Sequence, residues 1–230
     1  MPTALSILAA ALVAYIAGSI PWAVIVVRLF WGQDIRTLGS GNTGATNVLR
    51  VFGTVPGVSV LLLDAAKGAL GVWLAFLLTP AAWAEGTLVT PTYQQDWFMV
   101  LGAMGAIAGH SFSPFIGFRG GKGVATAAGA IVVLAPKVIP VMLVIFLVVV
   151  AIWKYVSLGS VVIAALFPGV SWLLYPDRYA LLAFSVVAAV LVIWRHRSNI
   201  GRIRRGEESK ITFRRRMWDE LKARYHDRSV

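Results

Sequence analysis

The chain has 230 residues, of which 58% are hydrophobic and only 13% are charged. Because soluble domains carry about 25% charged residues, this composition excludes an ordinary soluble domain and is typical of a membrane protein. Cysteine is absent, which excludes disulfides and thiolate metal sites. Much of the net charge of +11 lies in Arg195–Val230, which holds twelve Lys and Arg against five Asp and Glu. In a membrane protein this cluster favours the cytoplasmic side and anionic lipid head groups over nucleic acid.

The first apolar run, Ala4–Phe30, is long enough to cross a bilayer, since a transmembrane helix needs about 20 residues. A signal peptide would begin with a cation and have a shorter apolar core, and no Lys or Arg precedes this run. We therefore expect a retained span with the N-terminus outside. Gly18, Ser19 and Pro21 interrupt the run, and we expect them to produce a tolerated kink rather than a functional break.

Six further apolar runs follow the first. They are Val55–Leu78, Trp97–Gly109, Val124–Ala135, Val138–Trp153, Val156–Leu174 and Tyr179–Trp194. The sequence thus predicts an all-α, polytopic membrane protein with seven transmembrane helices and a cytoplasmic C-terminus. Several runs are shorter than a full span, so flanking residues must contribute or the spans must be short.

The charges in the loops support this topology. The inner side would hold 31–53, 110–123, 154–156 and the tail from residue 195. The outer side would hold 79–96, 135–137 and 175–178. Most Lys and Arg fall in the inner set, as the positive-inside rule requires. The same alternation of loops places both glycine-rich segments of the chain and the basic tail on the inner side of the membrane.

A glycine-rich polar segment, Gly39–Arg50, follows the first run. Its glycines let backbone N–H groups converge, and its hydroxyls, amides and arginine add donors and a cation. These groups suit an anion, above all a phosphate, although the same residues also form flexible turns. The segment matches G-x-G-x-x-G, but a transmembrane run precedes it where a dinucleotide fold requires a strand, so we reject that interpretation.

A second glycine-rich segment, Gly117–Gly123, carries Arg119 and Lys122. Its spacing fails the P-loop pattern, yet it offers backbone donors and a cation at a loop–helix junction. His110, at the end of the preceding run, is a candidate base or a side chain that hydrogen-bonds the loop. The three histidines of the chain lack metal-ligand spacing, so no metal site is predicted.

Asp64 and Lys67 lie within the second run, where charge is costly and normally faces protein or a polar cavity. Their i,i+3 spacing places them on one helical face, so they can pair. A structural ion pair and a contribution to a polar site both remain open. Gly105 and Gly109 form a G-x-x-x-G pattern, which predicts a close helix–helix contact.

Three separated segments together resemble the signature motifs of the bacterial acyl-phosphate:glycerol-3-phosphate acyltransferases. They are GSGNTGATNVLR (39–50), GHSFSPFIGFRGGKGVAT (109–126) and HRSNIGRIRRGEE (196–208), and DAAKG (64–68) is also similar to that family. The resemblance runs from about residue 15 to 210, with the motifs in the family's order. It divides the chain into a membrane acyltransferase domain, 1–210, and a basic cytoplasmic tail, 211–230.

The resemblance implies seven transmembrane helices in the bacterial inner membrane, with the active site at the cytoplasmic face. It implies transfer of a fatty acyl group from acyl phosphate to the 1-hydroxyl of glycerol 3-phosphate. The products would be 1-acyl-glycerol 3-phosphate (lysophosphatidic acid) and phosphate. No cofactor and no nucleic acid is implied. The expected partners are the two substrates, membrane lipids and a soluble enzyme that produces acyl phosphate.

The same resemblance assigns the site residues. The catalytic group would be Ser40, Asn42, Arg50 and Lys122. The substrate-binding group would be Gly41, Thr46, Asn47, His110, Arg119, Gly121, Gly123, His196 and Asn199. Asp64 and Lys67 would support the site. Within these groups the first glycine-rich segment would hold the phosphate of acyl phosphate, and His196 with Asn199 would bind glycerol 3-phosphate or orient its hydroxyl.

Acyl phosphate is already activated, so the reaction needs no covalent enzyme intermediate. Neither His110 nor His196 has an orienting carboxylate within its own motif. We therefore expect no dedicated general base, and a substrate phosphate oxygen would accept the hydroxyl proton. The alternative function is a polytopic carrier for a phosphorylated small molecule. A carrier needs access from both sides, however, whereas the predicted polar segments lie on one face.

Overall fold

A computed structural model describes residues 4–80, 85–88 and 90–211. Within these ranges the chain forms ten α-helices, two 3₁₀ turns (Ile35–Thr37 and Pro114–Ile116) and no strand. The helices are α1 (Ala4–Gly18), α2 (Trp22–Trp31), α3 (Ala45–Phe52), α4 (Thr54–Leu77), α5 (Tyr93–Ser111), α6 (Val124–Leu134), α7 (Val138–Trp153), α8 (Val156–Leu174), α9 (Tyr179–Arg195) and α10 (Arg197–Arg204). The predicted all-α class is therefore confirmed. All but one residue of the predicted tail, 211–230, lies outside the described residues.

Every predicted apolar run is helical, and the helix ends agree with the predicted ends to within a few residues. Four segments are long and apolar enough to cross a membrane: Ala4–Trp31, Thr54–Leu77, Tyr93–Ile116 and Val156–Leu174. A fifth is added if α9 and α10, which meet at a bend of 54°, form one span. The apolar helices α6 and α7 are shorter. The count of seven spans and the orientation of the termini stay predictions.

The predicted kink in the first span is a short break, since α1 ends at Gly18 and α2 begins at Trp22 while Ala4–Trp31 still counts as one candidate span. Pro21 has no N–H to continue the helical hydrogen bonding. The freed carbonyls find partners elsewhere in the protein: Ser113 Oγ donates to Ser19 O at 2.6 Å, and Lys67 Nζ donates to Ile20 O at 2.8 Å. The break therefore connects the first span to α4 and to the loop that follows α5.

Glycines let two helix pairs approach backbone to backbone. A Cβ on Gly109 would lie 2.2 Å from Tyr15 O, which confirms the close contact predicted from the G-x-x-x-G pattern. The α4–α6 pair is equally tight, since a Cβ on Gly129 would lie 1.8 Å from Ala65 O and one on Gly68 would lie 1.9 Å from Thr126 O. This contact sets the distance between α4 and α6, both of which carry residues of the site described below.

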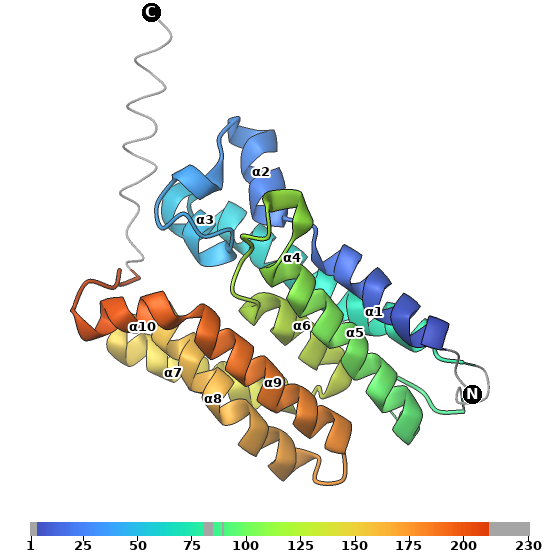
Figure 1. Cartoon of the computed structure of the whole chain (residues 1–230). Coiled ribbons are helices and arrows are strands. Elements are labelled where there is room, and N and C mark those ends of the chain that lie inside the picture. The colour runs from blue at the N-terminus through green and yellow to red at the C-terminus, as the bar shows by residue number, and fades with distance from the viewer. Residues whose placement is uncertain (1–3, 81–84, 89, 212–230) are drawn as a thin grey trace, which may run out of the picture.

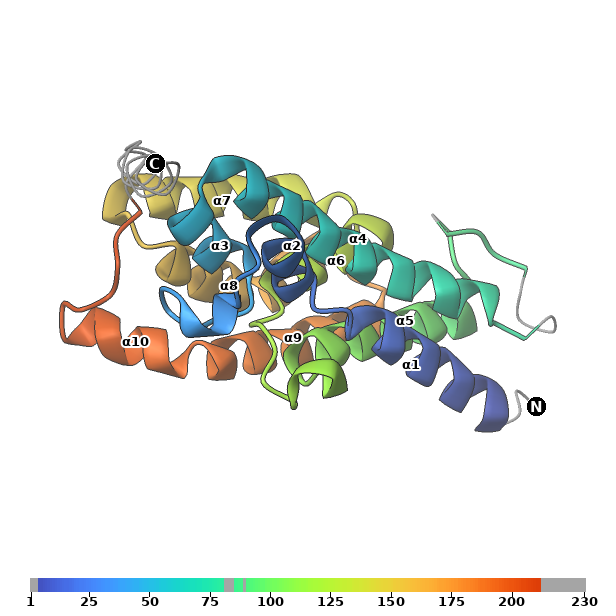
Figure 2. The same cartoon turned by 90° about the horizontal axis from the view of Figure 1, so that it is seen from above.

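The helices form an elongated bundle, and Figures 1 and 2 place α2, α3 and α10 at the end opposite the N-terminus. The largest buried apolar cluster includes Met99, Ile107 and Phe184 and joins α4 to α9. At the other end of the bundle, Arg178 forms an ion pair with Asp96 and donates to a backbone carbonyl of α6. This contact joins α5, α6 and α9 far from the glycine-rich segments.

The α4–α6 contact gives a test of the packing. We expect Gly129→Ala to lower the stability of the detergent-solubilised protein by about 1–3 kcal/mol, because the added methyl group overpacks against the backbone of α4. Gly169→Ala is the matched control, since nothing lies within 4 Å of a Cβ at that position of α8. Thermal unfolding of both variants checks this expectation. An unchanged melting temperature for Gly129→Ala would contradict the tight contact.

Candidate active site

A cavity of about 410 Å³ lies among α3, α4, α6, α7, α8 and the α9–α10 junction. Its wall includes most of the predicted site residues: Ser40, Asn42, Thr46, Asn47, Arg50, Asp64, His110, Lys122, Gly123, His196 and Asn199. Among the described residues, four predicted positions stay outside this wall: Gly41, Lys67, Arg119 and Gly121. The three signature segments and the charged part of α4 therefore meet at one cavity.

The first glycine-rich segment is a turn that one side chain organises. Gly39 and Gly41 adopt φ values of +57° and +69°, which other residues rarely reach. The buried Asn47 side chain accepts from Ser40 N–H at 2.9 Å and donates to the carbonyls of Leu38 and Asn42, each at 3.0 Å. Its amide is thus committed to the turn, so Asn47 shapes the site by holding the loop in place.

Two helix N-termini contribute to the cavity wall. Ala45 and Thr46 begin α3, and Val124 and Ala125 begin α6. The residues before them are the glycines Gly44 and Gly123, neither of which has a side chain that could cap the helix. The first N–H groups of a helix lack intrahelical partners and carry the positive end of its dipole. A cavity with two such ends is suited to anions.

Two cations, Arg50 and Lys122, also line the cavity. Arg50 donates to Ser209 O at 3.1 Å, and within the described residues its buried Nε has no hydrogen-bond partner. Lys122 Nζ donates to Asn199 Oδ1 at 2.5 Å, and burial lowers the pKa of Lys122 to about 8. In the part of the chain that the structure describes, neither cation forms an ion pair with a carboxylate.

Glu208 is a site residue that the sequence analysis missed. Its carboxylate is 5% exposed and accepts hydrogen bonds from Ser157, Asn199 and Arg202, each at 2.7 Å. Burial by itself would raise the pKa of Glu208, but these three donors lower it overall. The segment Glu207–Ile211 thereby folds back onto α8 and fixes the amide of Asn199, which in turn accepts from Lys122.

Arg195 is a second residue that the analysis missed, because it was interpreted only as part of a basic cluster that sets topology. Its guanidinium donates to Gly121 O at 2.9 Å and 3.1 Å and to Gly120 O at 2.5 Å. On the other side of this segment, Gly120 N–H and Gly121 N–H donate to the carbonyls of α5. The glycine segment is therefore held between α5 and the end of α9, immediately before Lys122.

The predicted pairing within α4 is confirmed, and it extends to a third residue. Lys67 Nζ lies 2.9 Å from Asp64 Oδ1, and His110 Nδ1 lies 3.5 Å from the same oxygen. His110 therefore has a neighbouring carboxylate, contrary to what its motif indicated, because the carboxylate comes from a different helix. Its other nitrogen, Nε2, lies beside Gly121, where an added Cβ would be only 2.2 Å away.

His196 is buried at the junction of α9 and α10. Its Nδ1 lies 2.8 Å from the carbonyl oxygen of Val192. Since a carbonyl only accepts hydrogen bonds, Nδ1 carries the proton in the neutral ring and Nε2 is left as an acceptor. Arg119, by contrast, is exposed and does not reach the cavity, so the structure separates it from the other predicted residues.

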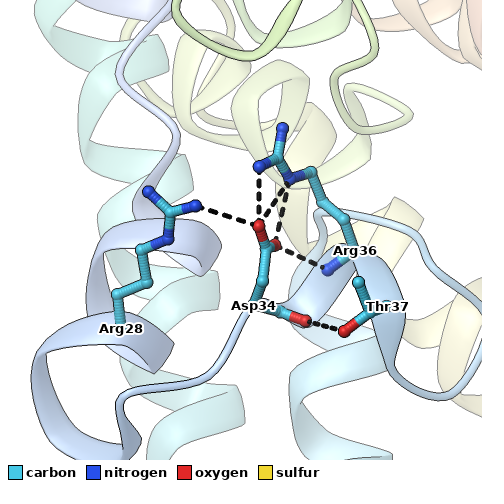
Figure 3. A network of polar contacts seen from close by, with 4 residues as sticks. All are labelled: Arg28, Asp34, Arg36 and Thr37. Carbon is cyan, nitrogen blue, oxygen red and sulfur yellow. Dashed lines mark hydrogen bonds and ion pairs between the residues drawn. The ribbon is translucent and has the colours of Figure 1, made fainter.

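A surface network supports the start of the first glycine-rich segment. Figure 3 shows the Asp34 carboxylate between Arg28 and Arg36, at 3.1 Å and 2.6 Å respectively. Asp34 also accepts from the backbone N–H of Arg36, and its own carbonyl accepts from Thr37 Oγ1. These contacts fix the turn between α2 and Gly39.

Apart from Ser160, the rest of the cavity wall is apolar. Leu61 and Leu62 of α4 and Leu143 and Phe146 of α7 line it together with residues of α8. Leu62 and Leu143 are more than half exposed, so this side of the cavity borders an exposed apolar surface. One cavity thus joins a cationic polar end to an apolar side.

A family model for glycerol-3-phosphate acyltransferase matches residues 8–206. The chain belongs to this family. Among its relatives, "Glycerol-3-phosphate acyltransferase 2" of Moorella thermoacetica is 45% identical over 205 residues, which cover 89% of this chain and 97% of the relative. The glycerol-3-phosphate acyltransferase of Listeria monocytogenes (strain EGD-e) is 42% identical over 202 residues, covering 87% and 94%.

Two solved structures share the fold. Both are crystal structures of PlsY (YgiH), an integral membrane glycerol 3-phosphate acyltransferase. The glycerol 3-phosphate form matches with a TM-score of 0.75 and 32% identity, and the lysophosphatidic acid form with 0.74 and 30%. Each match covers 90% of this chain and 96% of the other. The family member described here is thus an integral membrane acyltransferase.

Proposed function

We propose that this protein transfers a fatty acyl group from acyl phosphate to the 1-hydroxyl of glycerol 3-phosphate, giving lysophosphatidic acid and phosphate. The observation that carries the proposal is the charge of the cavity. Asp64 is balanced by Lys67, and Glu208 by Arg202, so Arg50 and Lys122 remain without a carboxylate among the described residues. Two cations beside two helix N-termini suit the phosphates of both substrates.

The bond changes need only positioned donors. The glycerol oxygen attacks the carbonyl carbon of acyl phosphate, and the bond between that carbon and the phosphate oxygen breaks. The phosphate leaves with the electron pair, so negative charge grows on it. Ser40 and Asn42, with the N-terminus of α3 and Arg50, would hold this phosphate. Donors that meet the growing charge stabilise the transition state more than the ground state.

The second phosphate would be that of glycerol 3-phosphate, with Lys122, Asn199 and His196 as its binding residues. Glu208 supports this arrangement because it holds the Asn199 amide so that the amide oxygen faces Lys122. PlsY, which is similar to this chain, has been solved in a glycerol 3-phosphate form. The apolar side of the cavity would receive the acyl chain, while the small polar acceptor would occupy the cationic end.

The hydroxyl proton would pass to a phosphate oxygen of a bound substrate. His110 is a poor acceptor in this arrangement, since its Nδ1 faces Asp64 and its Nε2 lies beside the Gly121 backbone. We propose that His110 with Asp64 and Lys67 holds the second glycine-rich segment in place. His196 would orient glycerol 3-phosphate through its free Nε2.

The cellular setting follows from the same proposal. The protein would lie in the bacterial inner membrane with seven spans. Its cavity would lie at the cytoplasmic face, where the water-soluble glycerol 3-phosphate can reach it. Residues 1–210 would form the membrane domain, and the basic tail from residue 211 would contact anionic lipid. A soluble enzyme would supply acyl phosphate.

Purified protein in detergent tests the proposed reaction against a carrier. We expect lysophosphatidic acid and phosphate to form from acyl phosphate and glycerol 3-phosphate, and acyl-CoA to be inactive as a donor. A carrier would release no phosphate without a membrane to work across. Activity with acyl-CoA alone would contradict the proposed donor.

Ser40→Ala and Arg50→Ala should each lower turnover by about 10²–10³-fold, because each removes a donor to the leaving phosphate. Their melting temperatures should stay close to that of the wild type. Ser59→Ala and Arg204→Ala are matched controls, since both side chains are exposed outside the cavity wall. Ordinary activity in both test variants would remove the first glycine-rich segment from the site.

Substitution of His196 tests which group accepts the hydroxyl proton. We expect His196→Ala to raise KM for glycerol 3-phosphate while kcat falls less than the 10²–10⁴-fold typical of a lost general base. Initial rates over a range of glycerol 3-phosphate concentrations separate the two constants. Should kcat drop to background while glycerol 3-phosphate still binds, the imidazole itself takes the proton.

The ionisation of Lys122 predicts a pH dependence. Its ammonium is charged below its pKa of about 8 and neutral above it. The value of kcat/KM for glycerol 3-phosphate, which reports the free enzyme, should therefore fall as pH rises through about 8. Lys122→Arg keeps its charge at every accessible pH and should remove this decline. A decline that persists unchanged in the arginine variant would assign it to another group.

A further inference from the structure

A second cavity, of about 60 Å³, lies deeper in the bundle among α6, α7, α8 and α9. Its wall is apolar apart from one serine, and the wall residues that do not also line the active-site cavity are all buried: Ala127, Ile131, Ala164, Phe167, Ala188, Ala189 and Val192. None of the residues to which the resemblance assigns a role lies in this wall. We call it the inner cavity.

The inner cavity adjoins the active-site cavity directly. Six residues line both of them: Val124, Ala128, Ile139, Met142, Ser160 and Ile163. The first of these, Val124, begins α6 and follows Gly123 and Lys122. The two cavities are therefore neighbours along α6.

Phe167 forms part of the wall of the inner cavity. Phe167 packs edge-to-face on Phe184, with ring centroids 5.7 Å apart, and both side chains are buried. The lipid side of the active-site cavity differs, because Leu61, Leu62 and Leu143 are 45%, 63% and 52% exposed. An acyl chain that extends toward the exposed leucines would end in lipid, where no side chain limits its length. A chain running inward would meet the two phenylalanines.

The chemistry of the wall suits methylene groups. Four of the seven wall residues that do not line the active-site cavity are alanines, which come from three different helices. Protein interiors are normally close-packed, and side chains around a cavity lose dispersion contacts that a ligand can restore. The one polar side chain, Ser160, donates its hydroxyl to Val156 O at 2.9 Å, so it offers no hydrogen to a ligand.

We propose that the inner cavity binds the methyl end of the donor's acyl chain and sets its length preference. The volume corresponds to about two water-sized groups, so the last two or so carbons of the chain would occupy it. Ala188 and Phe167 are then specificity-determining residues. The proposal rests on the proposed function, because it assumes an acyl donor in the active-site cavity.

The test is a competition among acyl phosphates of 12 to 18 carbons, with glycerol 3-phosphate as acceptor and the products separated by mass. Wild-type protein, Ala188→Leu and Phe167→Leu are compared. Ala188→Leu should shift the preference to shorter chains, because the leucine fills the inner cavity. Phe167→Leu should shift it to longer chains, because the end wall recedes. Each methylene excluded should change the relative kcat/KM by about fourfold.

Val190→Leu is the matched control, since Val190 lies on α9 close to Ala188 but is 64% exposed on the outer surface. Its product profile should equal that of the wild type. Activity of Ala188→Leu with the shortest donor would show that this variant is folded. If it is inactive with every donor, Phe167→Leu decides, because its expected shift has the opposite direction.

Wild-type activity separates the two proposals. If no acyl phosphate reacts, the proposed function fails. If the wild type is active but neither variant changes the chain-length profile, the proposed function stands and the inner cavity has no part in selection. An equal shift in Val190→Leu would also overturn the proposal, since the effect would then come from α9 as a whole.

Discussion

Two cations that have no carboxylate partner among the described residues set the main constraint on this structure. Arg50 and Lys122 come from segments that are far apart in the chain, and like charges in one cavity repel each other. The protein keeps them in place with neutral partners: Arg50 donates to the Ser209 carbonyl, and Lys122 donates to the Asn199 amide. Glu208 faces the cavity, but Arg202 and two neutral donors already occupy its oxygens. The unbalanced positive charge is thus left for ligand phosphates.

That arrangement depends on tight backbone contacts elsewhere. Lys122 directly precedes α6, and α6 packs on α4 through Gly129 and Gly68, with no room for a methyl group. Gly121 lies against His110 and is clamped from the other side by Arg195. Small residues thus determine the position of the charged Lys122 side chain. This explains why glycines without a direct chemical role are as informative about the site as its donors.

Hydropathy and local motifs were sufficient to predict the helices and most of the cavity wall. Long apolar runs leave the backbone no alternative to helix in a bilayer, so α7 and α8 match their predicted ends. Apart from the contacts of Glu208 with Asn199 and Arg202, the missed contacts join distant parts of the chain. Asp64 meets His110 across 46 positions, and Arg195 meets Gly121 across 74. No local spacing encodes such pairs. The contact at the break near Pro21 was not predicted for the same reason, because Lys67, which donates to Ile20 O, lies 47 positions from it.

The cavity also shows how one site could serve the two unlike substrates of the proposed reaction. A phosphate requires fixed donors and positive charge, whereas a fatty chain requires apolar surface without donors. Val124 joins the two regions, since it begins α6 at the cationic end and lines the inner cavity as well. The axis of α6 thus runs from the phosphate region into the apolar interior. In the proposed function, α3 and Arg50 would hold the leaving phosphate while the attached chain would lie beside α6, so the scissile bond would lie where the two regions meet.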